Sequence, residues 1–344
     1  MTVPAPDASA PGESAGPIPH WPGRLADLGG GERVWLTETN PANASPGSAD
    51  ASRSAGPGPE VALFVHGMSG AATNWTDLMG ELAPDFDCVA LDLPGSGFSP
   101  PPRRMSGYSV GALAGTVIRL IESLAQESGA GPVHLFGNSM GGAIAIRVAA
   151  RRPDLVRTLT LISPVLPDRR LNPATAHFPV ISVPLLGDWI VERYVRRYPP
   201  ENRVAGVFAT CYYDASRVHP QRFALEVEEL RRRDGLSYGI RSLTRAARTL
   251  TAETLRPRRL SLWRAAERLR APALVLFGSH DRLVSPRLAG PAARAFRNAR
   301  VVVLPESGHI AQMEHPAVVA RLFREMVDEA RAEGNVGSRN RVDA

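Results

Sequence analysis

The sequence predicts an α/β fold in which helices cover both faces of a mostly parallel sheet, with a helical insertion near the middle of the chain. Three observations lead to this expectation. From Val61 onward the chain carries short, almost wholly apolar runs, which are typical of parallel strands buried on both faces. Stretches of helical length lie between most of these runs. An interval of about 100 residues, between Ile162 and Ala273, instead resembles several helices punctuated by prolines.

Each element of this fold has a sequence signal. The alternating stretch Arg33–Glu38 follows three glycines and suits an antiparallel strand at the edge of the sheet. The helical insertion follows a strand, so it would lie at the carboxyl ends of the strands and roof the binding crevice. The apolar runs expected to form parallel strands are 61–65, 88–91, 133–136, 159–162, 273–277 and 301–304. Expected helices include 110–124, 142–151 and 316–331.

These assignments divide the chain into a core and a cap. The core comprises residues 24–165 and 271–333, and the helical cap comprises residues 166–270. Residues 1–23 and 334–344 are expected to be disordered tails. The beginning of the chain is rich in Pro, Ala, Gly and Ser, and a second stretch of the same composition runs from Pro41 to Pro59. Neither stretch is expected to pack against the core.

The charge of the chain is concentrated in the cap. All 40 basic residues are arginine, so the net charge of +6 persists at any ordinary pH. Residues 166–270 hold 20 arginines against 11 acidic residues, a local charge of +9. We interpret this as a solvated helical surface, and attraction of acidic substrates or an anionic lipid surface is the functional alternative. No recognition motif accompanies the charge, so no nucleic-acid partner is expected.

Composition also bears on location. No uninterrupted apolar run of about 18 residues occurs, and the first six residues have neither a basic start nor an apolar run. We therefore expect a cytoplasmic location without stable membrane insertion. Cys88 and Cys211 lie far apart in the sequence, and we expect each to be a small buried side chain rather than half of a disulfide or a nucleophile.

The strongest chemical signal follows the strand expected at 133–136. The chain continues as Gly-Asn-Ser-Met-Gly-Gly over residues 137–142, a Gly-x-Ser-x-Gly motif followed directly by a helix. Such a turn strains the backbone of Ser139 and holds its hydroxyl at the start of the helix, so Gly137 and Gly141 must flank it without side chains. The competing interpretation is a serine that caps a helix beside packing glycines.

Two further residues support Ser139 as a nucleophile. Asp281 follows the strand expected at 273–277, and His309 follows the strand expected at 301–304. Each residue therefore lies in a loop at the carboxyl end of a strand. A serine hydroxyl needs a base near neutral pH, and a carboxylate keeps the histidine in the tautomer that can act as one. The sequence thus predicts a triad with Ser139 as nucleophile, His309 as base and Asp281 as the acid.

Other residues compete for these roles. The rival acids are Asp168, which follows a strand, and Glu306. We expect His280 to be a surface neighbour of the site, His315 to lie at the start of a helix, and His134 to be a satisfied histidine inside a strand.

The loop after the first core strand contains His-Gly-Met-Ser-Gly over residues 66–70. Its backbone can supply one amide to an oxyanion, and the residue after the nucleophile can supply the second. We therefore expect the N–H groups of Met68 and Met140 to be the donors. His66 is expected to shape this loop through a structural hydrogen bond, with Gly67 beside it.

On these motifs the chain resembles the α/β-hydrolase superfamily over about residues 24–333. Within it, segments 137–142 and 308–315 look like those of the meta-cleavage product hydrolases. Those enzymes break carbon–carbon bonds in vinylogous diketone acids from aromatic ring degradation. Haloalkane dehalogenases and epoxide hydrolases are similar in layout but use an aspartate at the position of Ser139, so the resemblance disfavours both activities.

The sequence therefore predicts a serine hydrolase that cleaves an ester, or a related carbonyl bond, of a small and largely apolar substrate without a metal or organic cofactor. Carbon–carbon bond hydrolysis is the alternative, favoured if a cap arginine points at the site. A weakly catalytic receptor on the same fold is a third hypothesis. Aromatic cap residues could line an apolar pocket, although most are expected to be core: Trp189, Tyr194, Tyr198, Phe208, Tyr212, Tyr213 and Trp263.

Overall fold

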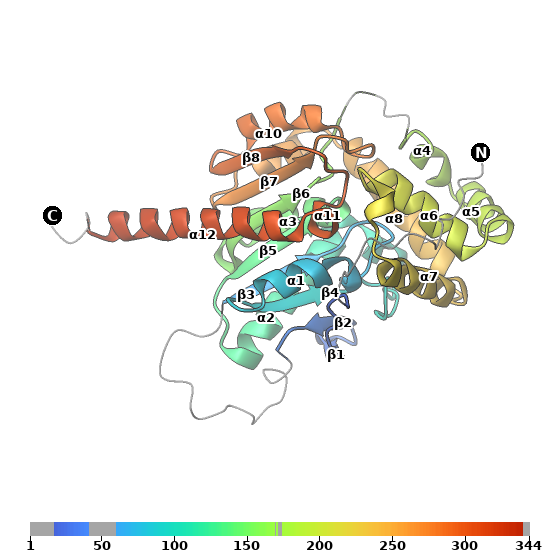
Figure 1. The fold of residues 1–344 in the computed structure, drawn as a ribbon, viewed down its shortest axis with the longest axis horizontal. Coiled ribbons are helices and arrows are strands. Elements are labelled where there is room, and N and C mark those ends of the chain that lie inside the picture. Colours follow the sequence, from blue (N-terminus) through green and yellow to red (C-terminus); the bar gives the residue numbers. More distant parts are fainter. Residues whose placement is uncertain (1–16, 41–59, 169, 171–173, 340–344) are drawn as a thin grey trace.

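The computed structural model describes residues 17–40, 60–168, 170 and 174–339. An eight-stranded sheet lies at its centre, in the order β1-β2-β4-β3-β5-β6-β7-β8 (Figure 1). Strands β3 to β8 are parallel, and β1 and β2 are antiparallel at one edge. The strands are β1 (Gly23–Asp27), β2 (Arg33–Glu38), β3 (Val61–Val65), β4 (Asp87–Leu91), β5 (Val133–Asn138), β6 (Val156–Ile162), β7 (Ala273–Gly278) and β8 (Ala299–Leu304). The predicted fold class is confirmed.

The six apolar runs all form strands of this sheet. The first, β3, has the expected bounds, and the others extend by up to three residues. The edge strand expected at Arg33–Glu38 is β2. Its partner β1 was not predicted, because only Ala26 of its five residues is buried and the pairing with β2 determines its conformation.

Strand residues alternate between the two faces of the sheet, so a separate hydrophobic core forms on each face. In β3, Leu63 and Val65 face the first core and Phe64 faces the second. Helices α2, α3 and α10 cover the first core, and α1 and α12 cover the second. Their bounds are α1 (Thr76–Leu82), α2 (Val110–Ser128), α3 (Met140–Arg151), α10 (Ala289–Ala295) and α12 (Pro316–Arg339).

Along the chain, a helical insertion follows β6 and precedes β7. It lies at one end of the sheet (Figure 1). Helices α6 and α7 pack around a small third core, which includes Phe208 and Leu230 and also Met313 of the sheet domain. Within the expected cap of 166–270, the last helix, α9, contributes Leu262 and Ala266 to the first sheet core, and α8 contributes Leu250. The bounds are α4 (Phe178–Ile181), α5 (Leu186–Arg197), α6 (Pro200–Cys211), α7 (Pro220–Asp234), α8 (Gly239–Thr254) and α9 (Leu262–Ala266).

The structure differs from the expected tails at both ends. Within the expected tail of 1–23, Trp21 packs against the second core and donates its indole N–H to the Thr76 oxygen at 3.3 Å. At the other end, α12 continues through residues 334–339, since the preceding alanines and glutamate favour a helix and no proline follows. Residues 1–16 and 340–344 of the expected tails, and the stretch 41–59, lie outside the described residues. Across the described ranges, we find no helix with the length and apolar character that a membrane span requires.

The tight turn from β5 into α3 predicts that Gly141 does not tolerate a side chain. A Cβ atom there would lie less than 3.0 Å from the backbone oxygens of Val65 and His66, which cannot move without distorting β3. We expect Gly141→Ala to lower the free energy of unfolding by about 3 kcal/mol in urea titrations followed by circular dichroism. In the matched control Gly206→Ala, a Cβ atom meets nothing within 4 Å, and a gain of about 0.5–1 kcal/mol is expected. Equal effects of the two substitutions would contradict this account of the turn.

Candidate active site

Ser139 occupies the sharp turn between β5 and α3. Its φ of 54° lies in the left-handed region, a strained conformation for a residue with a side chain. The turn is held on both sides, because the Ser139 amide donates to the Ile162 oxygen at 3.0 Å and the Ser139 oxygen accepts from the Val165 amide at 3.0 Å. A Cβ atom on Gly137 would lie less than 3.0 Å from the Gly141 backbone. Strand, strained serine and helix are thus arranged as the motif predicted.

His309 and Asp281 meet at the carboxyl ends of β8 and β7. The His309 Nδ1 lies 2.8 Å from Asp281 Oδ2, and both side chains are buried. The second carboxylate oxygen accepts from the amides of Leu283 and Val284 at 2.8 and 2.9 Å. Asp281 is therefore fixed by the backbone of its own loop and points at the histidine ring.

Burial acts to raise the pKa of Asp281, but the charge of His309 and the hydrogen bonds from His309 and Val284 outweigh it, so the pKa is lowered. An ionised carboxylate accepts hydrogen bonds and donates none. The proton in the Asp281 contact must therefore be on His309 Nδ1, so in the neutral imidazole the free lone pair is on Nε2. This is the tautomer that a general base requires.

Three residues that the triad prediction did not include hold the His309 loop. The Asn138 side-chain amide donates to the His309 oxygen at 3.0 Å, which connects this loop to the residue before Ser139. The His309 amide donates to the oxygen of Cys211, the last residue of α6, at 2.6 Å. Glu314 accepts from the amides of Gly308 at 2.7 Å and Tyr213 at 2.6 Å. The histidine is thus attached to both the core and the insertion.

The loop at residues 66–70 lies against Ser139. A Cβ atom on Gly67 would be 3.1 Å from the Ser139 Cβ, so a side chain there would press on the serine. His66 is buried, its Nδ1 lies 2.7 Å from the Gly67 oxygen, and its Nε2 accepts from the Leu93 amide at 3.0 Å. Burial lowers its pKa to about 4, which keeps the ring neutral. These contacts give His66 the structural role that the sequence indicated.

Ser139 and His309 line one cavity of about 170 Å³, together with Met68. Met140, the other expected oxyanion donor, is the first residue of α3 and directly follows Ser139. The insertion closes the cavity with apolar side chains from several helices: Phe178, Val204, Val207, Phe208, Leu230 and Leu250. Within the described ranges, no three His, Cys, Asp or Glu side chains group together as metal ligands would.

One wall of this cavity is charged. Helix α7 contributes Glu226, Glu229 and Arg233, spaced three and four residues apart so that they share a helix face. The Asn74 amide donates to Glu226 at 3.1 Å, and Arg233 donates to the Ser69 oxygen at 3.0 Å. Burial raises the pKa of Glu226. This wall was not predicted, because the spacing of charged residues on α7 is that of an ordinary solvated helix.

The rival residues lie elsewhere. Asp168 and Glu306 are exposed, and Asp168 accepts from the backbone two residues along its own loop. His280 is exposed and stacks on a tyrosine ring, and His315 contacts the Glu306 oxygen from the residue before α12. His134 is buried within β5, and burial lowers its pKa to about 4.

The cysteines and the cap aromatic residues are mostly structural. Cys88 and Cys211 are buried and unpaired, and burial raises the pKa of each thiol to about 12, so neither is a ready nucleophile. Among the cap aromatics, Phe208 lines the cavity and Tyr212 packs beside it. Trp263 packs on the first sheet core, Tyr213 stacks on His280, and three are exposed: Trp189, Tyr194 and Tyr198.

Comparison with known proteins gives a family match over most of the chain. A family profile described as alpha/beta hydrolase fold matches residues 61–316. The dihydrolipoyllysine-residue acetyltransferase component of the acetoin cleaving system of Cupriavidus necator is 28% identical over 262 residues, 75% of this chain. This chain spans 61% of that protein, less than two thirds of its length.

Two other relatives match over most of their own length. The pimeloyl-[acyl-carrier protein] methyl ester esterase of Neisseria meningitidis serogroup C is 26% identical over 270 residues, 77% of this chain and 92% of that protein. The 2-hydroxy-6-oxononadienedioate/2-hydroxy-6-oxononatrienedioate hydrolase of Cupriavidus pinatubonensis is 27% identical over 277 residues, 79% of this chain and 86% of that protein. The latter is a meta-cleavage product hydrolase, so the predicted partial likeness to that group is confirmed.

The buried, neutral His66 predicts a pH dependence of stability. Its pKa of about 4 in the folded chain compares with about 6.5 in the unfolded chain. Because the folded-state pKa is the lower one, the contribution of His66 to stability is complete above pH 6.5 and is lost as the pH falls through 4. A glutamine can donate and accept in the same place without titrating.

Between pH 7 and pH 4, we expect the wild type to lose about 3 kcal/mol of unfolding free energy relative to His66→Gln. Urea titrations of both proteins at half-unit pH intervals measure this difference. Parallel stability curves for the two proteins would show that His66 does not carry the predicted shift.

Proposed function

The chain belongs to the alpha/beta hydrolase fold family, and within it we propose that the protein is a serine hydrolase acting on an ester bond of a small substrate. One observation carries the proposal. Ser139 sits in a strained turn at a cavity that it shares with His309, whose ring is bonded at 2.8 Å to the buried carboxylate of Asp281. This combination supports an activated nucleophile rather than a serine that caps a helix.

In the proposed reaction, Ser139 Oγ attacks the carbonyl carbon of the ester while His309 Nε2 takes its proton. The negative charge that develops on the carbonyl oxygen is stabilised by the amides of Met68 and Met140. His309 then returns the proton to the leaving alcohol, and an acyl-enzyme remains. Water attacks the acyl-enzyme with His309 again as base, which releases the acid and restores Ser139.

The cavity suits a small ester. Its volume of about 170 Å³ is below the range of about 300–1,000 Å³ that is usual for drug-sized ligands. In our proposal, the cap formed by residues 166–270 determines which substrate fits. Glu226 and Glu229 outnumber Arg233 on the charged wall, so a neutral ester is favoured over a carboxylate. We also propose a cytoplasmic location.

Arg233 is the observation that supports a second candidate, carbon–carbon bond hydrolysis. It is a cap arginine that lines the Ser139 cavity, and guanidinium groups bind carboxylates well. The Cupriavidus pinatubonensis relative is a hydrolase of a dienedioate, a substrate with carboxylates. The same triad residues would act in that reaction, so substrate comparison must separate the two candidates.

The proposal predicts that Ser139→Ala removes activity without unfolding the protein. For a p-nitrophenyl ester series of rising acyl length, we expect kcat/KM to fall by at least about 10⁴-fold in Ser139→Ala. Circular dichroism and urea unfolding of the same samples check the fold. Full turnover by the variant would show that Ser139 is not the nucleophile. No turnover by a folded wild type would favour the hypothesis of a weakly catalytic receptor.

The orienting role of Asp281 predicts a large loss in Asp281→Asn. An asparagine amide would favour the wrong histidine tautomer, so we expect kcat to fall by about 10⁴-fold on the best ester. Asp168→Asn is the matched control, because Asp168 is the exposed rival acid, and its kcat should stay within about twofold. Loss of activity in Asp168→Asn but not in Asp281→Asn would show that Asp168 is the acid that orients His309.

Arg233→Gln separates the two candidate reactions. If the protein is an ester hydrolase, the wild type turns over esters faster than a vinylogous diketone acid, and Arg233→Gln changes the kcat/KM for esters by less than about threefold. Arg231→Gln, on the same helix but exposed, serves as the matched control. Two results together would establish carbon–carbon hydrolysis instead. The wild type would turn over the diketone acid faster than the esters, and Arg233→Gln, but not Arg231→Gln, would lower that turnover by about 30-fold or more.

A further inference from the structure

The insertion exposes a concentration of apolar side chains. Of the fourteen exposed large apolar or aromatic side chains in the described part of the chain, seven lie between residues 180 and 198. Leu185 is 83% exposed and Trp189 is 60% exposed. We call five of the seven, from α4, α5 and the loop between them, the apolar tip: Val180, Val183, Leu185, Leu186 and Trp189. Clustered exposure of this kind marks an interaction surface.

Helix α5 is held so that the apolar tip faces outward. A side chain on Gly187 would collide with the backbone oxygen of Ile181, and Val191 is buried. Asp188 accepts from the Thr244 hydroxyl at 2.6 Å, which fixes α5 against α8. Leu185 has a φ of 66°, so its outward placement is retained against backbone strain. The tip is therefore a built feature of the insertion.

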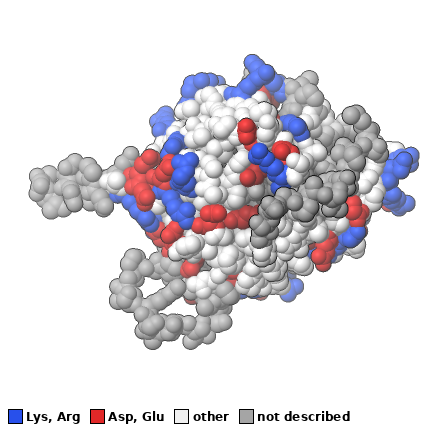
Figure 2. Space-filling model, in the orientation of Figure 1, with Lys and Arg blue, Asp and Glu red and all other residues white. Residues whose placement is uncertain are grey.

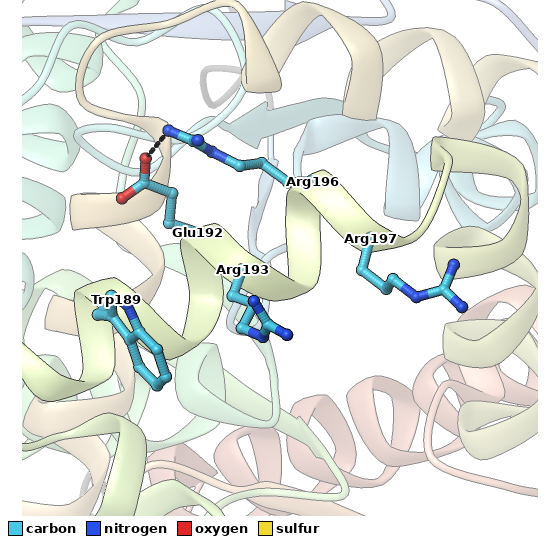
Figure 3. A pocket seen from close by; sticks show the side chains of 5 residues that line it. All are labelled: Trp189, Glu192, Arg193, Arg196 and Arg197. Atoms are coloured by element: carbon cyan, nitrogen blue, oxygen red, sulfur yellow. Dashed lines mark hydrogen bonds and ion pairs between the residues drawn. The ribbon is translucent and has the colours of Figure 1, made fainter.

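Arginines continue the same exposed surface along α5. Figure 3 shows Trp189 and Arg193 on one side of the helix, with Glu192 paired to Arg196 and Arg197 one turn beyond Arg193. The charges of Glu192 and Arg196 cancel in their ion pair. Arg193 and Arg197 then give this stretch of α5 a net charge of +2. At 1.5 Å per residue, these two side chains start about 10 and 16 Å along the axis from Leu186. Figure 2 shows blue atoms at this end of the molecule, as well as at several other places on the same face.

We propose that this face docks on an anionic lipid surface. The apolar tip enters the boundary between headgroups and acyl chains, and Arg193 and Arg197 contact lipid phosphates. The spacing fits an approach of α5 by its N-terminal end, because entry of the tip by about 5–10 Å then places Arg193 at headgroup level and Arg197 one turn farther from the acyl chains. Trp189 stands between the two zones, and tryptophan is enriched at such interfaces. An acidic protein would match the arginines but gives no reason for the exposed apolar tip.

Docking would also bring the lipid surface close to the cavity. Phe178, the first residue of α4, lines the Ser139 cavity, and Val180 of the same helix belongs to the apolar tip. One wall of the cavity and one part of the docking face are thus two residues apart. Lipid binding itself does not require catalysis, so it can be measured independently of the proposed function.

Vesicle sedimentation of the full chain tests the proposal. We expect binding to phosphatidylcholine vesicles with about 30 mol% phosphatidylglycerol, and at least about tenfold weaker binding to pure phosphatidylcholine. The double variant Arg193→Gln with Arg197→Gln should lower the partition coefficient about twentyfold, and Leu185→Ser with Trp189→Ser at least about tenfold. The arginine effect should shrink as the salt concentration rises.

Val303→Ser with Arg321→Gln is the matched control, because both side chains are exposed on the sheet domain, in β8 and α12. It should bind anionic vesicles as the wild type does. No binding by the wild type, or equal binding by either docking variant, would overturn the proposal. Binding to polyglutamate but not to vesicles would overturn it in favour of an acidic protein. A third result would also overturn it: the wild type is a dimer in analytical ultracentrifugation, the double variant Leu185→Ser with Trp189→Ser is a monomer, and the wild type does not bind vesicles.

Discussion

Close backbone contact between Gly141 and the end of β3 is the constraint on which the candidate site depends. Only a residue without a Cβ atom can approach the Val65 and His66 oxygens this closely, so α3 begins directly against β3. The turn that results holds Ser139 at a φ of 54°. Because β3 also leads into the loop at residues 66–70, Ser139 and the proposed oxyanion loop are fixed by the same strand.

The histidine depends on a second set of contacts that cross from core to insertion. Asn138, next to Ser139, donates to the His309 oxygen, and the His309 amide donates to the Cys211 oxygen at the end of α6. Glu314 joins the same two regions through backbone amides. A displacement of α6 would therefore move His309 relative to Ser139. The charged wall of the cavity and the apolar tip both belong to the insertion that these bonds position.

The sequence predicted the parts of this arrangement that follow from local pattern. Apolar runs marked the parallel strands, and the loop positions of Asp281 and His309 followed from those strands. Residues whose partners are distant in sequence were missed: Glu314 acts through Tyr213, and the α7 wall faces the cavity only once the insertion has folded over Ser139. Strand β1 and the last turns of α12 were missed because their own residues carry weak signals, and in β1 pairing with β2 decides the conformation.

The most direct test of the central claim is to treat the folded protein with a fluorophosphonate and locate the adduct by mass spectrometry of its peptides. A phosphonate reacts with a serine that a neighbouring base has activated. The account predicts one adduct per chain, on the peptide that contains Ser139. An adduct on another buried serine near the cavity, such as Ser163 or Ser307, or no adduct on a folded protein, would contradict it.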